Sequence, residues 1–128
     1  MVTQTDQPSR GSTMEKLLRI VNLEDGFPSV EQARSRLDSE LQSARKAGVR
    51  VVKIIHGYGS SGVGGDLRIA LQATLRQMAD RREIRACIFG ENWRTSDDSA
   101  WNLLKQAPEL KQDRDLGRGN RGITIVVL

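Results

Sequence analysis

The sequence has little of several residue types: one cysteine, one histidine, three prolines and five aromatic residues among 128. A single cysteine, Cys87, excludes an intramolecular disulfide, and one cysteine with one histidine is too few ligands for a structural zinc site. The apolar run around Cys87 favours a small buried side chain in a reducing compartment. No apolar run approaches the roughly 20 residues of a membrane helix, and the first residues lack the apolar core of a signal peptide. We therefore expect a cytoplasmic protein without a membrane segment.

The charge balance is moderately basic. Lys and Arg number 20 against 16 Asp and Glu, which gives a formal net charge of +4. Such a surplus favours anionic partners without identifying one. The length suits one domain with its own core, which we expect over residues 16–128. Residues 1–15 are rich in Ser, Thr, Gln and Pro, and this composition predicts a flexible tail.

Hydrophobic periodicity indicates alternating strands and helices. β-rich apolar segments predict four strands, over residues 17–23, 49–55, 84–89 and 122–128. Apolar stripes at helical spacing predict two main helices between them, over residues 30–47 and 66–82, and one short helix before the last strand. We expect an α/β two-layer sandwich with a four-stranded mixed sheet packed against the two main helices.

Local signals place the helix ends. Ser29 and Gln32 have the spacing of a capping box, and Gly48 is suited to end the helix that they begin. Asp66 is expected to cap the second helix, and Pro108 to end the short third one.

The segment "IIHGYGSSGVGGDLR", residues 54–68, holds the only histidine, His56, and five of the twelve glycines. Three of these glycines fit G-x-G-x-x-G between a strand and a helix, the pattern of a dinucleotide site. That site also needs an acidic residue at the end of the next strand, and the spacing falls at Glu83, ahead of that strand. The loop has no lysine for a Walker-type phosphate site either.

A simpler anion site remains. N–H groups of a strand-to-helix loop lie near the positive end of a helix dipole, where phosphate is the natural ligand. The basic residue Lys53 precedes this loop. The candidate phosphate-binding residues within it are Gly57, Tyr58, Gly59, Ser60, Ser61 and Gly62. The alternative is that the glycines only make a long turn and that His56 forms local hydrogen bonds.

"VVKIIHGYGSSGVGGDLR", residues 51–68, resembles the second signature of the Smr (small MutS-related) domain family, in which an apolar strand leads into His-Gly-x-Gly and Leu-Arg opens the next helix. "VNLEDG", residues 21–26, is similar to a damaged first signature, Leu-Asp-Leu-His-Gly, and "GITIVVL" to the closing strand. The resemblance implies an α/β sandwich that binds nucleic acid. Some members of the family also nick DNA or cleave RNA, with or without a metal ion, so the resemblance makes such cleavage an activity to test.

The resemblance assigns residues directly only in the second signature. His56, Gly57 and Gly59 match His-Gly-x-Gly, and Leu67 with Arg68 match Leu-Arg. In the first signature this chain departs from the family.

The family's Asp falls at Asn22 and its His at Glu24 or Asp25. Without that pair we expect weak or undetectable cleavage. If the domain cleaves, His56 would transfer a proton, while Glu24 or Asp25 would orient its ring or hold Mg²⁺. No other cofactor is expected.

Three functions follow as hypotheses. The first is a nucleic-acid-binding domain, for RNA or DNA, in which loop amides with Arg68, Arg118 and Arg121 contact phosphates and endonuclease activity is optional. The second is a non-catalytic adaptor that uses residues 90–122 to bind a protein partner, such as the ribosome or repair proteins. The third is an enzyme or binder for a small phosphorylated ligand. Trp93 and Trp101 are interpreted as packing anchors.

Overall fold

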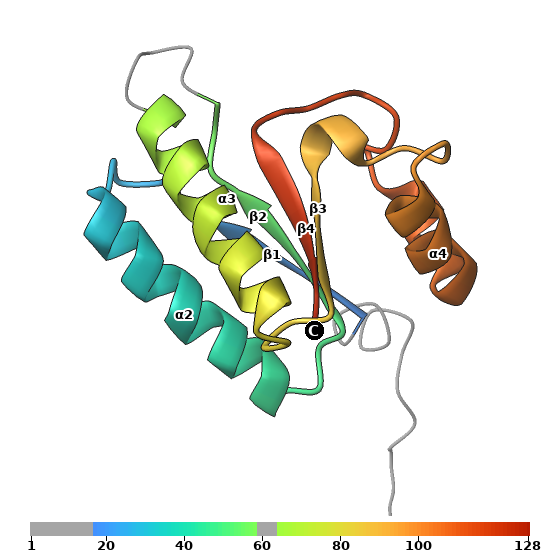
Figure 1. Cartoon of the computed structure of the whole chain (residues 1–128), viewed down its shortest axis with the longest axis horizontal. Coiled ribbons are helices and arrows are strands. Elements are labelled where there is room, and N and C mark those ends of the chain that lie inside the picture. The colour runs from blue at the N-terminus through green and yellow to red at the C-terminus, as the bar shows by residue number, and fades with distance from the viewer. Residues whose placement is uncertain (1–16, 59–63) are drawn as a thin grey trace, which may run out of the picture.

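The computed structural model describes residues 17–58 and 64–128, so the expected tail over residues 1–15 lies outside the described residues. Strands and α-helices alternate in the expected order (Figure 1). They are β1 (Leu18–Asn22), α2 (Val30–Lys46), β2 (Val51–Ile55), α3 (Gly64–Asp80), β3 (Ala86–Phe89), α4 (Asp98–Gln106) and β4 (Ile123–Val127), with 3₁₀ helices η1 (Gly90–Asn92) and η2 (Pro108–Gln112). Each strand begins later than the sequence pattern predicted.

The four strands form one mixed sheet in the order β1-β2-β4-β3. β1 is parallel to β2, whereas β4 is antiparallel to both of its neighbours. The carboxyl ends of β1, β2 and β3 therefore share one edge of the sheet with the amino end of β4. We call this the carboxyl edge. The expected α/β fold with a four-stranded mixed sheet is confirmed.

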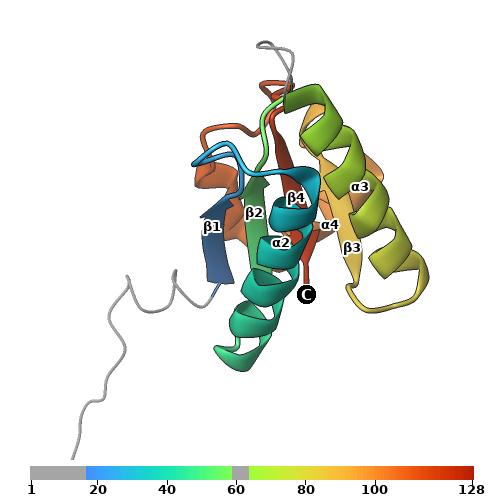
Figure 2. The same cartoon turned by 90° about the vertical axis from the view of Figure 1, so that its left-hand side faces the viewer.

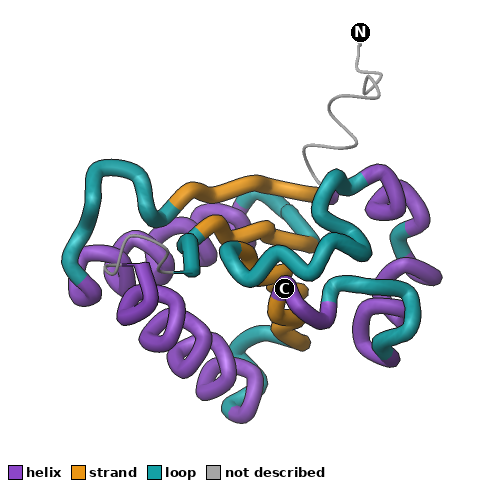
Figure 3. The backbone as a smooth tube through the Cα atoms, turned by 90° about the horizontal axis from the view of Figure 1, so that it is seen from above, coloured by secondary structure: helices purple, strands orange, loops and turns teal. Residues whose placement is uncertain are grey.

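Helices lie on both sides of the sheet (Figures 2 and 3). α2 and α3 pack on one face through a core that includes Leu37, Leu71 and Ile54. On the other face, α4 and η2 cover Val51 and other inward residues of the strands through a second core. The short helix thus closes the face that the two main helices leave open. No helix among the described residues is long and apolar enough to cross a membrane.

Several helix ends lie where the sequence indicated. Both hydrogen bonds of the capping box between Ser29 and Gln32 are present, and Gly48 follows α2 with φ of 75°. α3, however, begins at Gly64, so Asp66 lies in its first turn and is not the N-cap. A carboxylate there still faces the positive end of the helix dipole. Pro108 follows α4 as expected and opens η2.

The two tryptophans differ in their environment. Trp93 is buried, and its indole N–H donates to Asp113 at 2.9 Å, which confirms a packing anchor. Trp101 is 41% exposed, so the same prediction is wrong for it. The buried side of α4 consists of Ala100, Leu103 and Leu104, at i, i+3 and i+4, and this places Trp101 toward solvent. Lys111 lies 5.7 Å from its ring centroid.

Candidate functional site

Backbone hydrogen bonds join three loops at the carboxyl edge. The carbonyl of Gly122, just before β4, accepts from the N–H groups of His56 at 2.9 Å and Gly57 at 3.0 Å. The N–H of Leu23, just after β1, donates to Ile55 at 2.8 Å. Segments from three distant parts of the sequence therefore form one surface around the start of the glycine-rich loop.

Gly57 favours glycine because of its backbone conformation. Its φ of 75° lies in the left-handed region, which side chains rarely adopt. A Cβ at this position would also meet the carboxylate of Glu24, which belongs to a flexible exposed side chain and can move away. Glu24 thus lies directly against Gly57, so the structure brings together the two segments that resemble the Smr signatures.

His56 follows β2 at the carboxyl edge, as predicted, but its imidazole is fully buried. Nδ1 lies 2.6 Å from the carbonyl oxygen of Gly57, and Nε2 lies 2.9 Å from the hydroxyl of Thr124. A carbonyl only accepts, so Nδ1 carries the proton and Nε2 of the neutral ring accepts from the Thr124 hydroxyl. Burial lowers the pKa of His56 and outweighs the opposing hydrogen bond to Gly57.

These contacts leave His56 without a free ring nitrogen for the predicted proton transfer. Both ring nitrogens of His56 are used inside the protein, and neither reaches solvent in this conformation. The ring instead fixes the carbonyl of Gly57 and connects β2 to β4. The remaining residues of the predicted phosphate loop, Gly59, Ser60, Ser61 and Gly62, lie outside the described residues.

Glu24 and Asp25 are exposed in the turn after β1. Asn22, where the family has Asp, accepts from the backbone N–H groups of Glu24 at 3.0 Å and Asp25 at 3.2 Å. Neither carboxylate holds the ring of His56, whose partners are Gly57 and Thr124, so the expected orienting contact is absent. Among residues 17–58 and 64–128, no group of three or more His, Cys, Asp and Glu side chains could hold a metal ion.

The structure corrects the expectation for Lys53. Its side chain is buried on the α4 face of the sheet, 2.8 Å from Asp113 and 2.5 Å from Asp115. Burial acts to raise the pKa of Asp115, but the hydrogen bonds from Lys53 and Asn120 and the charge of Lys53 outweigh it, and the net shift is downward. An ammonium group enclosed by two carboxylates is not available to a phosphate. The alternating sides of β2 explain this, since Lys53 faces away from Ile54.

Arg68 lies in α3 beside this edge and is partly buried. Its guanidinium pairs with Glu91 of η1 at 2.8 Å. Within the described part of the chain, Arg68 Nε, Gln72 Nε2 and Glu91 Oε1 are buried without hydrogen-bond partners. The pair therefore retains both donor and acceptor capacity next to the start of the glycine-rich loop.

Arg118 and Arg121 are exposed on the loop before β4, and Tyr58 is 56% exposed. The carbonyl of Gly122 accepts from the N–H groups of His56 and Gly57, so this loop lies against Tyr58. A Cβ built at Gly122 would lie 3.3 Å from the ring of Tyr58. The loop that carries the two exposed arginines thus lies beside the exposed Tyr58 and the beginning of the predicted phosphate loop.

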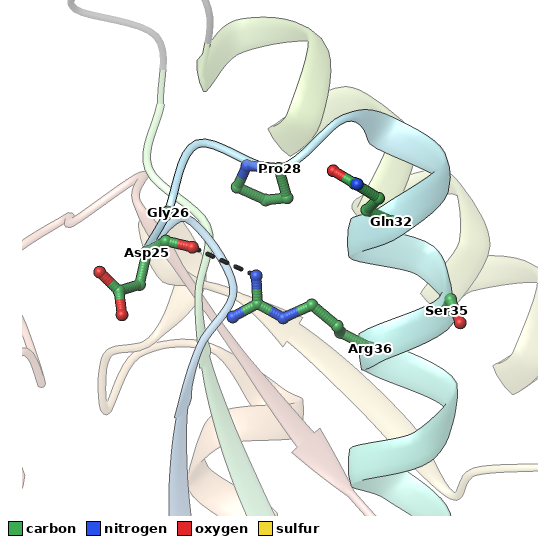
Figure 4. Close-up of a pocket in the computed structure, with 6 residues that line it drawn as sticks. All are labelled: Asp25, Gly26, Pro28, Gln32, Ser35 and Arg36. Atoms are coloured by element: carbon green, nitrogen blue, oxygen red, sulfur yellow. Dashed lines mark hydrogen bonds between the residues drawn. The ribbon is translucent and has the colours of Figure 1, made fainter.

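Two further residues of this surface escaped the sequence analysis. Phe27 is 91% exposed and has φ of 50°, and Arg36 of α2 donates to the carbonyls of Asp25 at 3.1 Å and Asn22 at 3.3 Å. Figure 4 shows Arg36 in a surface hollow of about 380 Å³ between α2 and this turn. An aromatic residue in a turn between a strand and a capping box was the signal available for Phe27.

The fold and this edge define an α/β domain with a glycine-rich, arginine-bearing loop surface. The Smr domain family model matches residues 26–92, just over half of the chain, and the chain belongs to the Smr domain family. No curated protein matches the chain. The fold is similar to the crystal structure of the Smr domain of Thermus thermophilus MutS2, with a TM-score of 0.50 and 22% identity over 88% of this chain and 96% of that one.

Proposed function

We propose that this Smr domain binds nucleic acid by phosphate contacts at its carboxyl edge. The observation that carries the proposal is the shared hydrogen-bonding of Gly122, which places the loop of Arg118 and Arg121 against Gly57 and Tyr58. Arginine forks match phosphate oxygens, and glycine-rich backbone presents N–H groups without steric hindrance. The net charge of +4 has the sign that such binding needs.

Arg68 is the third cation of this proposal. Its pair with Glu91 is only partly buried, so a phosphate could join the guanidinium through its unpartnered Nε after a small side-chain movement. We predict that backbone N–H groups of the loop from Gly57 to Gly62 also donate hydrogen bonds to phosphate. Lys53 has no part in it, because its ammonium is already paired with Asp113 and Asp115.

Phosphodiester cleavage is a separate and weaker part of the proposal. His56 has no free ring nitrogen, and Asn22 replaces the acidic residue of the first signature. These observations support binding without efficient turnover.

A binding series across salt concentrations tests the proposal. Purified protein is titrated with single- and double-stranded RNA and DNA. Real phosphate contacts give affinity that falls steeply with salt, and Arg121→Ala should weaken binding to every sequence and lower the salt slope by about one unit. Arg81→Ala, an exposed arginine beyond the opposite end of α3, is the matched control and should leave both unchanged.

Two results would overturn the proposal. One is absent affinity for all four nucleic acids at low salt, which would favour the adaptor hypothesis. The other is equal loss in the Arg121 and Arg81 variants, which would show that only total charge matters.

A further inference from the structure

The aromatic residues of this chain are few, and two of them are strongly exposed at one place. Among the five, Trp93 is buried, and Phe89 lies under the guanidinium of Arg76, 4.8 Å from its ring centroid. Phe27 is 91% exposed and Tyr58 is 56% exposed, more than any other aromatic residue of the chain. Both follow strands that end at the carboxyl edge.

The backbone of Phe27 is held in a costly conformation. Its φ of 50° lies in the left-handed region, where a bulky side chain is an outlier. The ring gains almost no burial in return, so it contributes little to the stability of the fold. A strained, exposed aromatic side chain without a packing role indicates a binding function.

Contacts through Glu24 link the two turns that carry these aromatic residues. The backbone N–H of Phe27 donates to the carbonyl of Glu24, and the Glu24 carboxylate lies against Gly57, the neighbour of Tyr58. Figure 2 shows the connection from β1 to α2 beside the end of β2. The two rings therefore belong to adjoining turns of one surface.

Charge is distributed unevenly over this surface. Arg36 on one side donates only to backbone carbonyls within the described residues, so its charge has no carboxylate partner there, and Arg121 lies in the loop on the other side. Glu24 and Asp25 lie in the turn between them. Carboxylates repel phosphates but accept hydrogen bonds from base amino groups. This pattern suits bases over the turn and phosphates near the arginines.

We propose that Phe27 and Tyr58 are stacking platforms for unpaired bases, so that the domain binds single-stranded nucleic acid in preference to duplex. The proposal rests on the proposed nucleic-acid-binding function and specifies its substrate class. In a duplex the base faces are covered by their neighbours, whereas a single strand can place them on aromatic rings.

The test compares one sequence as single strand and as duplex, at fixed salt, with the full chain. Wild type should bind the single strand more tightly. Phe27→Leu and Tyr58→Leu each remove a π-face but keep apolar bulk, and each should weaken single-strand binding by roughly 5- to 150-fold, the range measured for one stacked base. For Phe27→Leu the duplex affinity and the salt slope should not change. Tyr58→Leu also removes a hydroxyl from the proposed phosphate-binding surface, so its loss of affinity should be larger for the single strand than for the duplex. Trp101→Leu, at the exposed tryptophan of α4, is the matched control and should bind like wild type.

Phe27→Gly separates binding from folding. Glycine adopts φ of 50° without strain, so this variant should unfold at a temperature a few degrees higher while losing single-strand affinity like Phe27→Leu. A purely structural role would instead leave affinity unchanged.

The binding measurements separate failure of this inference from failure of the proposed function. If wild type binds no nucleic acid, the proposed function fails and this inference fails with it. If wild type binds single strand and duplex equally, or the Phe27 and Tyr58 variants bind like wild type, this inference alone is overturned. The exposed rings would then belong to a protein-binding surface.

Discussion

The imidazole of His56 connects two parts of the carboxyl edge at the level of single atoms. It donates to the carbonyl of Gly57 and accepts from the hydroxyl of Thr124, and the second contact requires the neutral ring. Protonation would leave Nε2 with a proton facing a hydroxyl that must then reorient. Burial also disfavours the charged form, in agreement with the lowered pKa of His56.

This lowered pKa predicts that stability depends on pH. In the unfolded chain His56 titrates near 6.5, so below that pH the unfolded state binds more protons and stability falls as pH decreases. The stabilisation from the neutral ring is complete above pH 6.5 and is lost as pH falls toward the lowered folded pKa. One proton gives a slope of at most about 1.4 kcal/mol per pH unit. Chemical denaturation between pH 5 and 7 measures it.

His56→Gln is the control for this prediction. Glutamine does not titrate, so the variant should be less stable at pH 7 but lose less with acidification. Parallel pH profiles for wild type and variant would show that another group is responsible.

His56 and Phe27 show which residue properties could be predicted from the sequence. The position of His56 after a strand followed from the apolar run before it. Its burial did not, because burial depends on Thr124, which lies 68 positions away. Phe27 appeared in the sequence only as part of a turn, since its strained φ is set by three-dimensional context.

At the scale of elements, the segment from η2 to β4 is held by a chain of polar contacts. Lys53 pairs with Asp115, which accepts from Asn120 Nδ2 at 3.0 Å, and Asn120 Oδ1 accepts from the N–H of Gly122 at 2.8 Å. The backbone of Asn120 also lies so close to Gly90 that no Cβ would fit there. This chain of contacts fixes the loop that carries the two proposed phosphate-binding arginines.

Asn120→Ala should therefore weaken both folding and binding. It removes two hydrogen bonds, which predicts a loss of about 1–3 kcal/mol in the free energy of unfolding. Nucleic-acid affinity should fall because the loop is no longer held against Gly57, while the salt slope stays near that of wild type because the arginines remain. Denaturant melts and salt titrations measure the two effects.

Asn102→Ala, at an exposed position of α4, is the matched control. It should change neither quantity appreciably. An Asn120 variant with wild-type affinity would mean that the polar contacts do not position the arginine loop for binding.

At the scale of the whole molecule, the sequence predicted the order of elements better than their arrangement. The four strands and three α-helices of residues 17–58 and 64–128 follow from local periodicity and caps. The packing of α4 on the second face and the buried ion pairs of Lys53 depend on contacts between distant segments. A single lysine within an apolar strand was the available signal for a buried ion pair, because an unpaired charge there would be strongly destabilising.

The arrangement of residues at the carboxyl edge predicts weak cleavage. The segments that resemble the two Smr signatures meet at Gly57, but Asn22 stands at the position of the first signature's Asp, and Glu24 or Asp25 stands at that of its His. Wild type should bind nucleic acid and cleave it at or below the limit of detection, with or without Mg²⁺.

The double variant Asn22→Asp, Glu24→His restores both residue types. The carboxylate introduced by Asn22→Asp keeps an acceptor for the two backbone N–H groups that Asn22 now holds, so the turn should fold. An exposed imidazole beside Gly57 supplies the acid or base that buried His56 does not, and the cleavage rate should rise by roughly 10²-fold, the low end of such catalysis. Gel assays under single-turnover conditions measure the rate, with Glu24→Gln as the control that changes charge without adding an imidazole. Efficient wild-type cleavage that His56→Ala abolishes would contradict this prediction and would mean that His56 leaves its buried position to react.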